Sequence, residues 1–194
     1  LGGIFGGGFS GVRFDPGSFP RPGVDLRMGL TVTFDQAVEG ATTTVTVPGA
    51  DGPRPVQVRL PAGVDDGQVV RVPGGGGPGV NGGPAGDLYL DVSVGTHPRF
   101  GRRGRHLTLD ASLAFADAVL GTELRVTTYD GDTVTIRVPA GTPSGRTFRV
   151  RGRGIGGGDL LVTVVIEVPR RLDDDQRAAI EALRDAFGHH ADAA

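Results

Sequence analysis

Six consecutive residues of the chain have the spacing of a nucleotide-binding signature. Gly152-Arg153-Gly154-Ile155-Gly156-Gly157 fits GxGxxG, in which glycines let the backbone approach a pyrophosphate. That chemistry also requires a helix that begins at the loop. The alternating apolar residues of 160–168 predict a strand there instead. We therefore interpret the glycines as a hairpin loop between two strands.

Few residues are suited to metal binding or to nucleophilic catalysis. The chain has no cysteine, and no two of its four histidines (His97, His106, His189 and His190) have metal-ligand spacing on a predicted helix or strand. Neither an HExxH helix nor a GxSxG turn occurs in the sequence. We expect no metal, no other cofactor and no enzymatic activity.

Arginines gather in two segments, Arg99 to Arg105 and Arg146 to Arg153, which raises the hypothesis of nucleic-acid binding. Proteins of that class combine a basic surface with aromatic residues on which bases stack. Only Phe148 is interleaved with the second cluster, and the net charge of the whole chain is −2. We prefer solvated surface charge as the interpretation and keep nucleic-acid binding through these loops as the alternative.

An apolar surface is the third candidate. Met28 and Leu30 on one predicted strand, with Val45 and Val47 on the next, could line a groove whose strand edge accepts an extended peptide. Methionine suits such contacts because its side chain is flexible and polarisable. A β-sandwich also needs apolar stripes for its own core, and from the residues alone the core is the stronger interpretation.

A tandem repeat positions all these residues. PAGVDDGQVVRV at 61–72 recurs as PAGTPSGRTFRV at 139–150, a displacement of 78. Phe34, Val38 and Gly40 correspond to Phe115, Val119 and Gly121 at a displacement of 81, and GDL at 86–88 recurs at 158–160. The chain therefore contains two copies of one unit, which predicts two small domains.

Alternation of apolar and polar residues predicts strands in both copies. In the first copy they span 24–32, 42–47, 56–60, 69–72 and 88–94, with one helical turn at 35–39; in the second they span 107–113, 124–129, 133–138, 147–150 and 160–168. Asp130-Gly131 predicts a tight hairpin turn. We expect an all-β protein of antiparallel strands.

The two ends of the chain differ from this pattern. Residues 1–22 interleave glycine and proline with phenylalanine and predict a flexible linker. After Pro169, Asp173 and Gln176 form a capping box that predicts a helix ending at Gly188, with a narrow apolar stripe that must pack on something. No apolar run is long enough to cross a bilayer, so we expect no membrane contact and a cytoplasmic location.

The serial order of these segments resembles the C-terminal half of the DnaJ family of J-domain co-chaperones. The resemblance rests on the glycine/phenylalanine tract, the paired LPAG and VPAG units, GDLYLDVSVGTHPRF at 86–100 and RRLDDDQRAAIEALRDAF at 170–187. It implies two barrel-like β-sandwich domains and a C-terminal dimerisation segment. We accordingly divide the chain into a linker (1–22), a client-binding domain (23–100), a second β domain (101–169) and a dimerisation helix with its tail (170–194).

The resemblance also implies a function. In the family a groove between the first two strands of the first domain holds unfolded polypeptide for a DnaK-type chaperone. The residues that match this groove are Met28, Leu30, Thr43, Val45 and Val47, with Phe100 as a further member. Ile180, Leu183 and Phe187 would form the contacts of a homodimer.

Two features of the family are missing from the sequence. The short turn from Pro48 to Pro55 stands where the cysteine-rich zinc-binding insert would lie, so the chain is similar to the zinc-free class. The HPD tripeptide of the J-domain is also absent, because His97-Pro98-Arg99 differs at its third residue. This stretch is thus expected to hold clients without stimulating the partner's ATPase.

Overall fold

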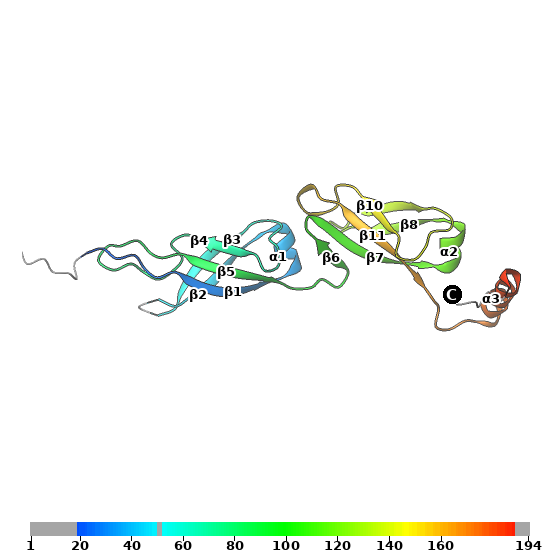
Figure 1. The fold of residues 1–194 in the computed structure, drawn as a ribbon, viewed down its shortest axis with the longest axis horizontal. Helices are drawn as coiled ribbons and strands as arrows, with labels where there is room; N and C mark the ends of the chain where they lie inside the picture. Colours follow the sequence, from blue (N-terminus) through cyan, green and yellow to red (C-terminus); the bar gives the residue numbers. More distant parts are fainter. Residues whose placement is uncertain (1–18, 50–51, 189–194) are drawn as a thin grey trace, which may run out of the picture. The chain divides into compact units, whose positions relative to one another are not determined.

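The computed structural model describes residues 19–49 and 52–188. The chain divides into two compact units between His97 and Pro98, each with its own sheets (Figure 1). Most of the glycine/phenylalanine tract, the tip of the turn that begins at Pro48, and His189 and His190 lie outside the described residues. The described part contains no helix that is long and apolar enough to span a membrane.

The described part of the first unit contains five strands and one short helix. They are β1 (Leu26–Val32), α1 (Phe34–Glu39), β2 (Ala41–Val47), β3 (Arg54–Leu60), β4 (Val69–Val72) and β5 (Leu88–Val94). One sheet has the order β1-β5-β4, and β2 pairs with β3 in a second sheet. Apolar side chains of both sheets form one core, which includes Val32, Val47, Leu60, Leu88 and Leu90. The predicted all-β architecture is confirmed.

The second unit repeats this plan. Its elements are β6 (Phe100–Arg103), β7 (His106–Ala114), α2 (Phe115–Leu120), β8 (Thr122–Thr127), β9 (Thr133–Val138), β10 (Thr147–Val150), a 3₁₀ turn at Ile155–Gly157 and β11 (Leu160–Glu167). The sheets have the orders β10-β11-β7-β6 and β8-β9. The β8–β9 hairpin turns at Asp130-Gly131, where Gly131 has a φ of +86°, as the sequence predicts.

The expectation of purely antiparallel strands is wrong at one place in each unit. β1 pairs in parallel with β5, and β7 pairs in parallel with β11 (Figure 1). In the first unit the first and last strands thus lie side by side and run in the same direction, and in the second unit β7 and the last strand, β11, do the same. Alternation within a strand reports which face is buried but not the direction of its neighbour.

Strand β6 lies where the sequence predicts only a charged joint. Its residues pair with β7, so that Phe100 lies opposite Leu109 and Arg103 opposite His106. Phe100 therefore belongs to the second unit, which begins earlier than the predicted boundary at residue 101.

The linker also ends earlier than the predicted residue 22. Arg21 and Val80 exchange two backbone hydrogen bonds of 3.0 and 2.9 Å, and Gly23 donates to the carbonyl of Pro84. A Cβ added to Gly83 would lie 2.0 Å from the carbonyl oxygen of Arg21, so this contact requires glycine. Residues 19–24 are thus held against the glycine-rich loop between β4 and β5.

Helix α3 (Asp174–Phe187) begins at the predicted capping box. The Asp173 carboxylate accepts a hydrogen bond from the Gln176 N–H at 2.7 Å, and the Gln176 side chain accepts one from the Asp173 N–H at 3.2 Å. These bonds satisfy N–H groups that have no partner inside the helix. No residue of α3 is buried, so its apolar stripe is uncovered in a single chain.

Candidate functional site

In the described part of the first unit, the outer strands of the two sheets, β1 and β4 in one and β2 and β3 in the other, each have a strand neighbour on one side only. The edges of β1 and β2 are the candidate site. Within the described residues β1 pairs only with β5, and β2 pairs only with β3. Both strands nevertheless contribute side chains to the same core, which brings them to the same part of the unit. An unpaired edge offers N–H and C=O groups to which an extended peptide can bind.

Strand β1 supplies apolar surface beside its free edge. Its side chains alternate, with Arg27, Gly29 and Thr31 exposed and Met28 and Leu30 half-buried. Met28 and Leu30 pack against the margin of the core. On the exposed face Arg27 makes a two-bond ion pair with Asp91 of β5, at 2.8 and 2.7 Å. Met28 and Leu30 therefore combine support from the core with access to solvent.

Strand β2 provides less accessible apolar surface than the sequence analysis expects. Thr43 is half-buried, but the exposed fraction of the side chains falls to 8% at Val45 and 0% at Val47. Both valines belong to the core cluster. Val45 and Val47 therefore do not form an exposed wall of a groove. Their side chains point inward from β2 and pack between the two sheets of the unit.

Phe100 does not join these residues within the first unit. It is buried in the second unit, where its ring meets that of Tyr129 edge to face, with centroids 5.7 Å apart. This contact accounts for its burial without any role in a groove.

The dimerisation residues expected from the sequence lie on one face of α3. Ile180, Leu183 and Phe187 are spaced by three and four positions, which places them on one stripe, and all three side chains are exposed. The structure brings these three together.

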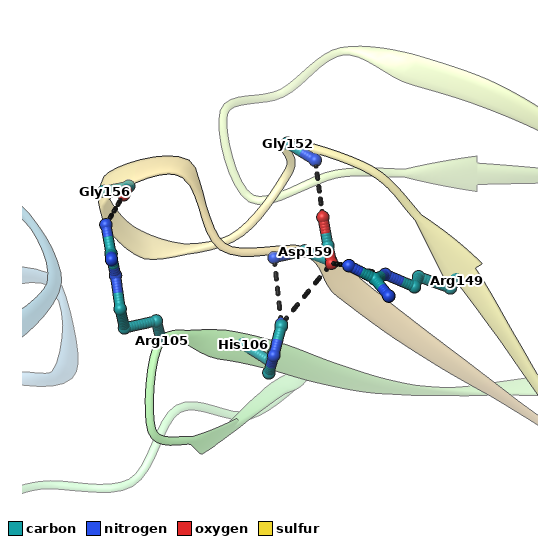
Figure 2. A network of polar contacts seen from close by, with 6 residues as sticks. All are labelled: Arg105, His106, Arg149, Gly152, Gly156 and Asp159. Carbon is teal, nitrogen blue, oxygen red and sulfur yellow. Dashed lines mark hydrogen bonds and ion pairs between the residues drawn. The ribbon is translucent and has the colours of Figure 1, made fainter.

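The GxGxxG segment is a hairpin loop, as predicted, because it joins the antiparallel strands β10 and β11. Figure 2 shows the side chains that hold it. The Asp159 carboxylate accepts hydrogen bonds from Gly152 N–H, at 2.8 Å, and from Arg149. These bonds hold the pKa of Asp159 below its ordinary value. The glycine N–H that could meet a phosphate is thus occupied by the protein itself.

His106 also takes part in this network rather than being simply solvated. Its Nδ1 accepts a hydrogen bond from the Asp159 N–H at 3.1 Å, and Arg105 donates to the carbonyl of Gly156 (Figure 2). In the described residues no group of three or more histidine, aspartate or glutamate side chains is placed to hold a metal ion.

In the first unit an aspartate holds the corresponding loop with the same hydrogen bonds, and the sequence analysis did not identify this role. Asp87 accepts from Gly74 N–H at 3.0 Å and from Arg71 at 2.7 Å, and these bonds lower its pKa. Its own N–H donates to Asp25 at 2.7 Å. The repeated GDL at 86–88 and 158–160 could have indicated this role, because its aspartate binds the loop that precedes the last strand in each unit.

Arginines of both basic segments have structural partners. Arg149 pairs with Asp159, Arg153 pairs with Asp130 and Asp132, and Arg105 binds a backbone carbonyl. These contacts favour the interpretation of the arginines as structural and solvated charge. Nucleic-acid binding has no support from them.

Comparison with known proteins agrees with this architecture. A family model described as the DnaJ C terminal domain matches residues 19–169. The chain belongs to this family. The DnaJ family consists of co-chaperones that are not enzymes, in keeping with the lack of catalytic motifs in the sequence.

Curated DnaJ proteins also match this chain. The chain is 53% identical over 143 residues to Chaperone protein DnaJ 2 of Cutibacterium acnes, 52% over 142 residues to Chaperone protein DnaJ 1 of Streptomyces coelicolor, and 45% over 139 residues to Chaperone protein DnaJ of an Exiguobacterium species. These alignments cover 71%, 71% and 69% of this chain. They cover only 38%, 36% and 38% of the relatives, so the chain corresponds to little more than a third of a DnaJ protein.

Proposed function

We propose that this chain is the client-holding part of a cytoplasmic DnaJ-type co-chaperone. It binds unfolded polypeptide at the first unit for delivery to a DnaK-type chaperone. The observation that carries the proposal is the pair of unpaired edges, β1 and β2, beside the half-buried side chains of Met28 and Leu30. Membership of the DnaJ family supports it.

Backbone pairing explains how such a site accepts many sequences. A client strand that adds to β2 binds through main-chain N–H and C=O groups, which every residue except proline supplies in full. Alternate client side chains then contact Met28, Leu30 and Thr43. Val45 and Val47 support β2 from beneath, because both are already buried in the core.

A single site of this kind binds weakly, and dimerisation would compensate for that. The exposed stripe of Ile180, Leu183 and Phe187 is the proposed homodimer contact. Two copies present two edges to one client, so the second contact becomes intramolecular and the overall affinity rises when the client spans both sites.

Fluorescence anisotropy of a labelled, unstructured apolar peptide tests the client site. We expect Met28→Asp to weaken binding roughly tenfold or more, because it places a charge beside an apolar client side chain. Val69→Asp is the matched control: Val69 is exposed on β4, at the other edge of the same sheet. Equal binding by wild type and Met28→Asp would refute the site.

Salt separates the proposal from electrostatic binding. Affinity for an uncharged apolar peptide should change little between about 50 and 300 mM salt, because salt screens interactions between charges and apolar contacts involve none. A steep fall with salt would instead indicate binding through the arginines.

A further inference from the structure

The loop between β4 and β5 contains the only asparagine of the sequence, Asn81, and a glycine follows it. Asn81 has a φ of +53° and Gly82 a φ of +80°, and the Gly83 N–H donates to the Val80 carbonyl at 3.0 Å. Positive φ at both central residues defines a type I′ turn, which asparagine followed by glycine favours. The turn accounts for the two residue types, and it also places a chemically reactive pair at the surface.

An asparagine that precedes glycine can lose its side-chain amide without an enzyme, because the next main-chain nitrogen can attack the side-chain carbonyl carbon. Glycine permits this ring closure, since it has no Cβ to shield its nitrogen and its backbone rotates freely. Asn81 and Gly82 are both exposed, and a Cβ added to Gly82 would meet no atom within 4 Å. In residues 19–49 and 52–188 the Gly82 N–H donates no hydrogen bond that would hold it. The nucleophile and the amide are therefore both open to solvent.

The reaction needs only water as a co-reactant. The Gly82 nitrogen bonds to Cγ of Asn81 while the Cγ–Nδ2 bond breaks, and the proton lost by Gly82 leaves with the amide as ammonia. Water then opens the resulting succinimide. Opening at Cγ leaves an aspartate, whereas opening at the main-chain carbonyl leaves an isoaspartate, whose main chain is longer by one methylene.

The turn that would be lengthened is packed against the segment that precedes β1. Arg21 and Val80 exchange two backbone hydrogen bonds, and the Asn81 Nδ2 donates to the Phe19 carbonyl at 3.5 Å. A Cβ added to Gly83 would lie 2.0 Å from the Arg21 carbonyl oxygen, so the two backbones are in close contact there. An extra main-chain methylene between Val80 and Gly83 therefore breaks the register of both contacts with Arg21.

We propose that Asn81-Gly82 is a site of spontaneous deamidation, and that its isoaspartate product releases residues 19–23 from the first unit. The released stretch of about five residues spans roughly 17 Å when extended. The modification accumulates with the age of the molecule. It leaves the strands of the candidate client site unchanged and lengthens the free segment ahead of them.

Ageing of the intact chain tests the site. The protein is held at mildly alkaline pH and physiological temperature, and samples are digested and analysed by mass spectrometry with fragmentation that distinguishes aspartate from isoaspartate. We expect the peptide that contains Asn81 to deamidate, with isoaspartate as the main product. Asn81→Gly is the matched control, because glycine keeps the positive φ of the turn but has no side-chain amide. An Asn81 that stays intact while a synthetic peptide of residues 76–86 is fully deamidated would overturn the site.

Hydrogen exchange of the same samples tests the release. In the isoaspartate form the amides of Arg21 and Gly23 should exchange roughly tenfold faster or more, because their hydrogen bonds to Val80 and Pro84 open, while β5 keeps its protection. Fresh Asn81→Asp supplies the charge without the extra methylene and should keep the protection of both amides. Unchanged exchange in the aged protein, or an equal loss of protection in fresh Asn81→Asp, would overturn release through a lengthened main chain.

Discussion

The substitution Val47→Ala tests whether Val47 is a core residue or a client contact. Truncation of a core residue lowers the stability of the unit, whereas truncation of a client contact lowers the affinity for the client. Val47→Ala removes two methyl groups from a side chain that is 0% exposed. At about 0.8 kcal/mol per buried methylene, the lost transfer energy is about 1.6 kcal/mol. The cavity left behind adds to this loss. We expect the free energy of unfolding of the first unit to fall by about 2–3 kcal/mol.

Hydrogen exchange followed by mass spectrometry in rising urea measures each unit separately in the intact chain. Peptides from β5 report on the first unit and peptides from β11 on the second. With a urea dependence of about 1–2 kcal/mol per molar for a unit of this size, the β5 midpoint should fall by roughly 1–3 M while the β11 midpoint stays unchanged. Val126→Ala is the matched control, since Val126 is buried on β8 and should shift only the β11 midpoint.

Client binding completes the test. Without denaturant, Val47→Ala should bind the apolar peptide within about twofold of wild type, because its side chain lies beneath β2 and does not reach a client. A loss of tenfold or more in affinity, with the β5 midpoint unchanged, would show that Val47 is a client contact and that its assignment to the core is wrong.

Two further predictions concern the loops that close the units. The pKa of Asp159 lies below its ordinary value of 3.8 because Gly152 N–H, and then Arg149, stabilise the carboxylate. Such a group stabilises the fold above its unfolded-state pKa, and this stabilisation is lost as the pH falls through the folded value. Asp159→Asn should therefore lower the melting temperature at pH 7 and flatten its decline below pH 3.8; parallel melting curves for the two proteins would contradict this. Gly83→Ala should speed hydrogen exchange in residues 19–26, since its Cβ would meet the Arg21 carbonyl, whereas Gly29→Ala, which has open space around its Cβ, should leave exchange there unchanged.

The repeat and its strands were predictable because duplication preserves local patterns. Apolar alternation located ten of the eleven strands that the structure describes in residues 19–49 and 52–188, and the capping box located the start of α3. Strand β6 was missed because its sequence, FGRR, carries charge and glycine, and its pairing with β7 is a contact that no local pattern encodes. The parallel pairing of β1 with β5 was missed for the same reason, since it joins residues about sixty positions apart.

The candidate site was predictable only in part. The spacing of Met28, Leu30, Val45 and Val47 identified inward positions on two strands, but it could not separate a half-buried edge from a buried core. Edge position does not explain this difference, because β1 and β2 both lie at the edge of a sheet. It depends on packing between the two sheets: Val45 and Val47 belong to the core, whereas Met28 and Leu30 lie at its margin and keep access to solvent.

The two copies of the unit differ in one sheet and at their short helices. β6 adds a fourth strand to the sheet of the second unit, whereas the corresponding sheet of the first unit has three strands. Phe34 of α1 is buried beside His97, but Phe115 of α2 is 49% exposed. Duplication has therefore preserved the strand pattern while the residues beyond the strands changed, so the same sequence repeat produces two units with different surfaces.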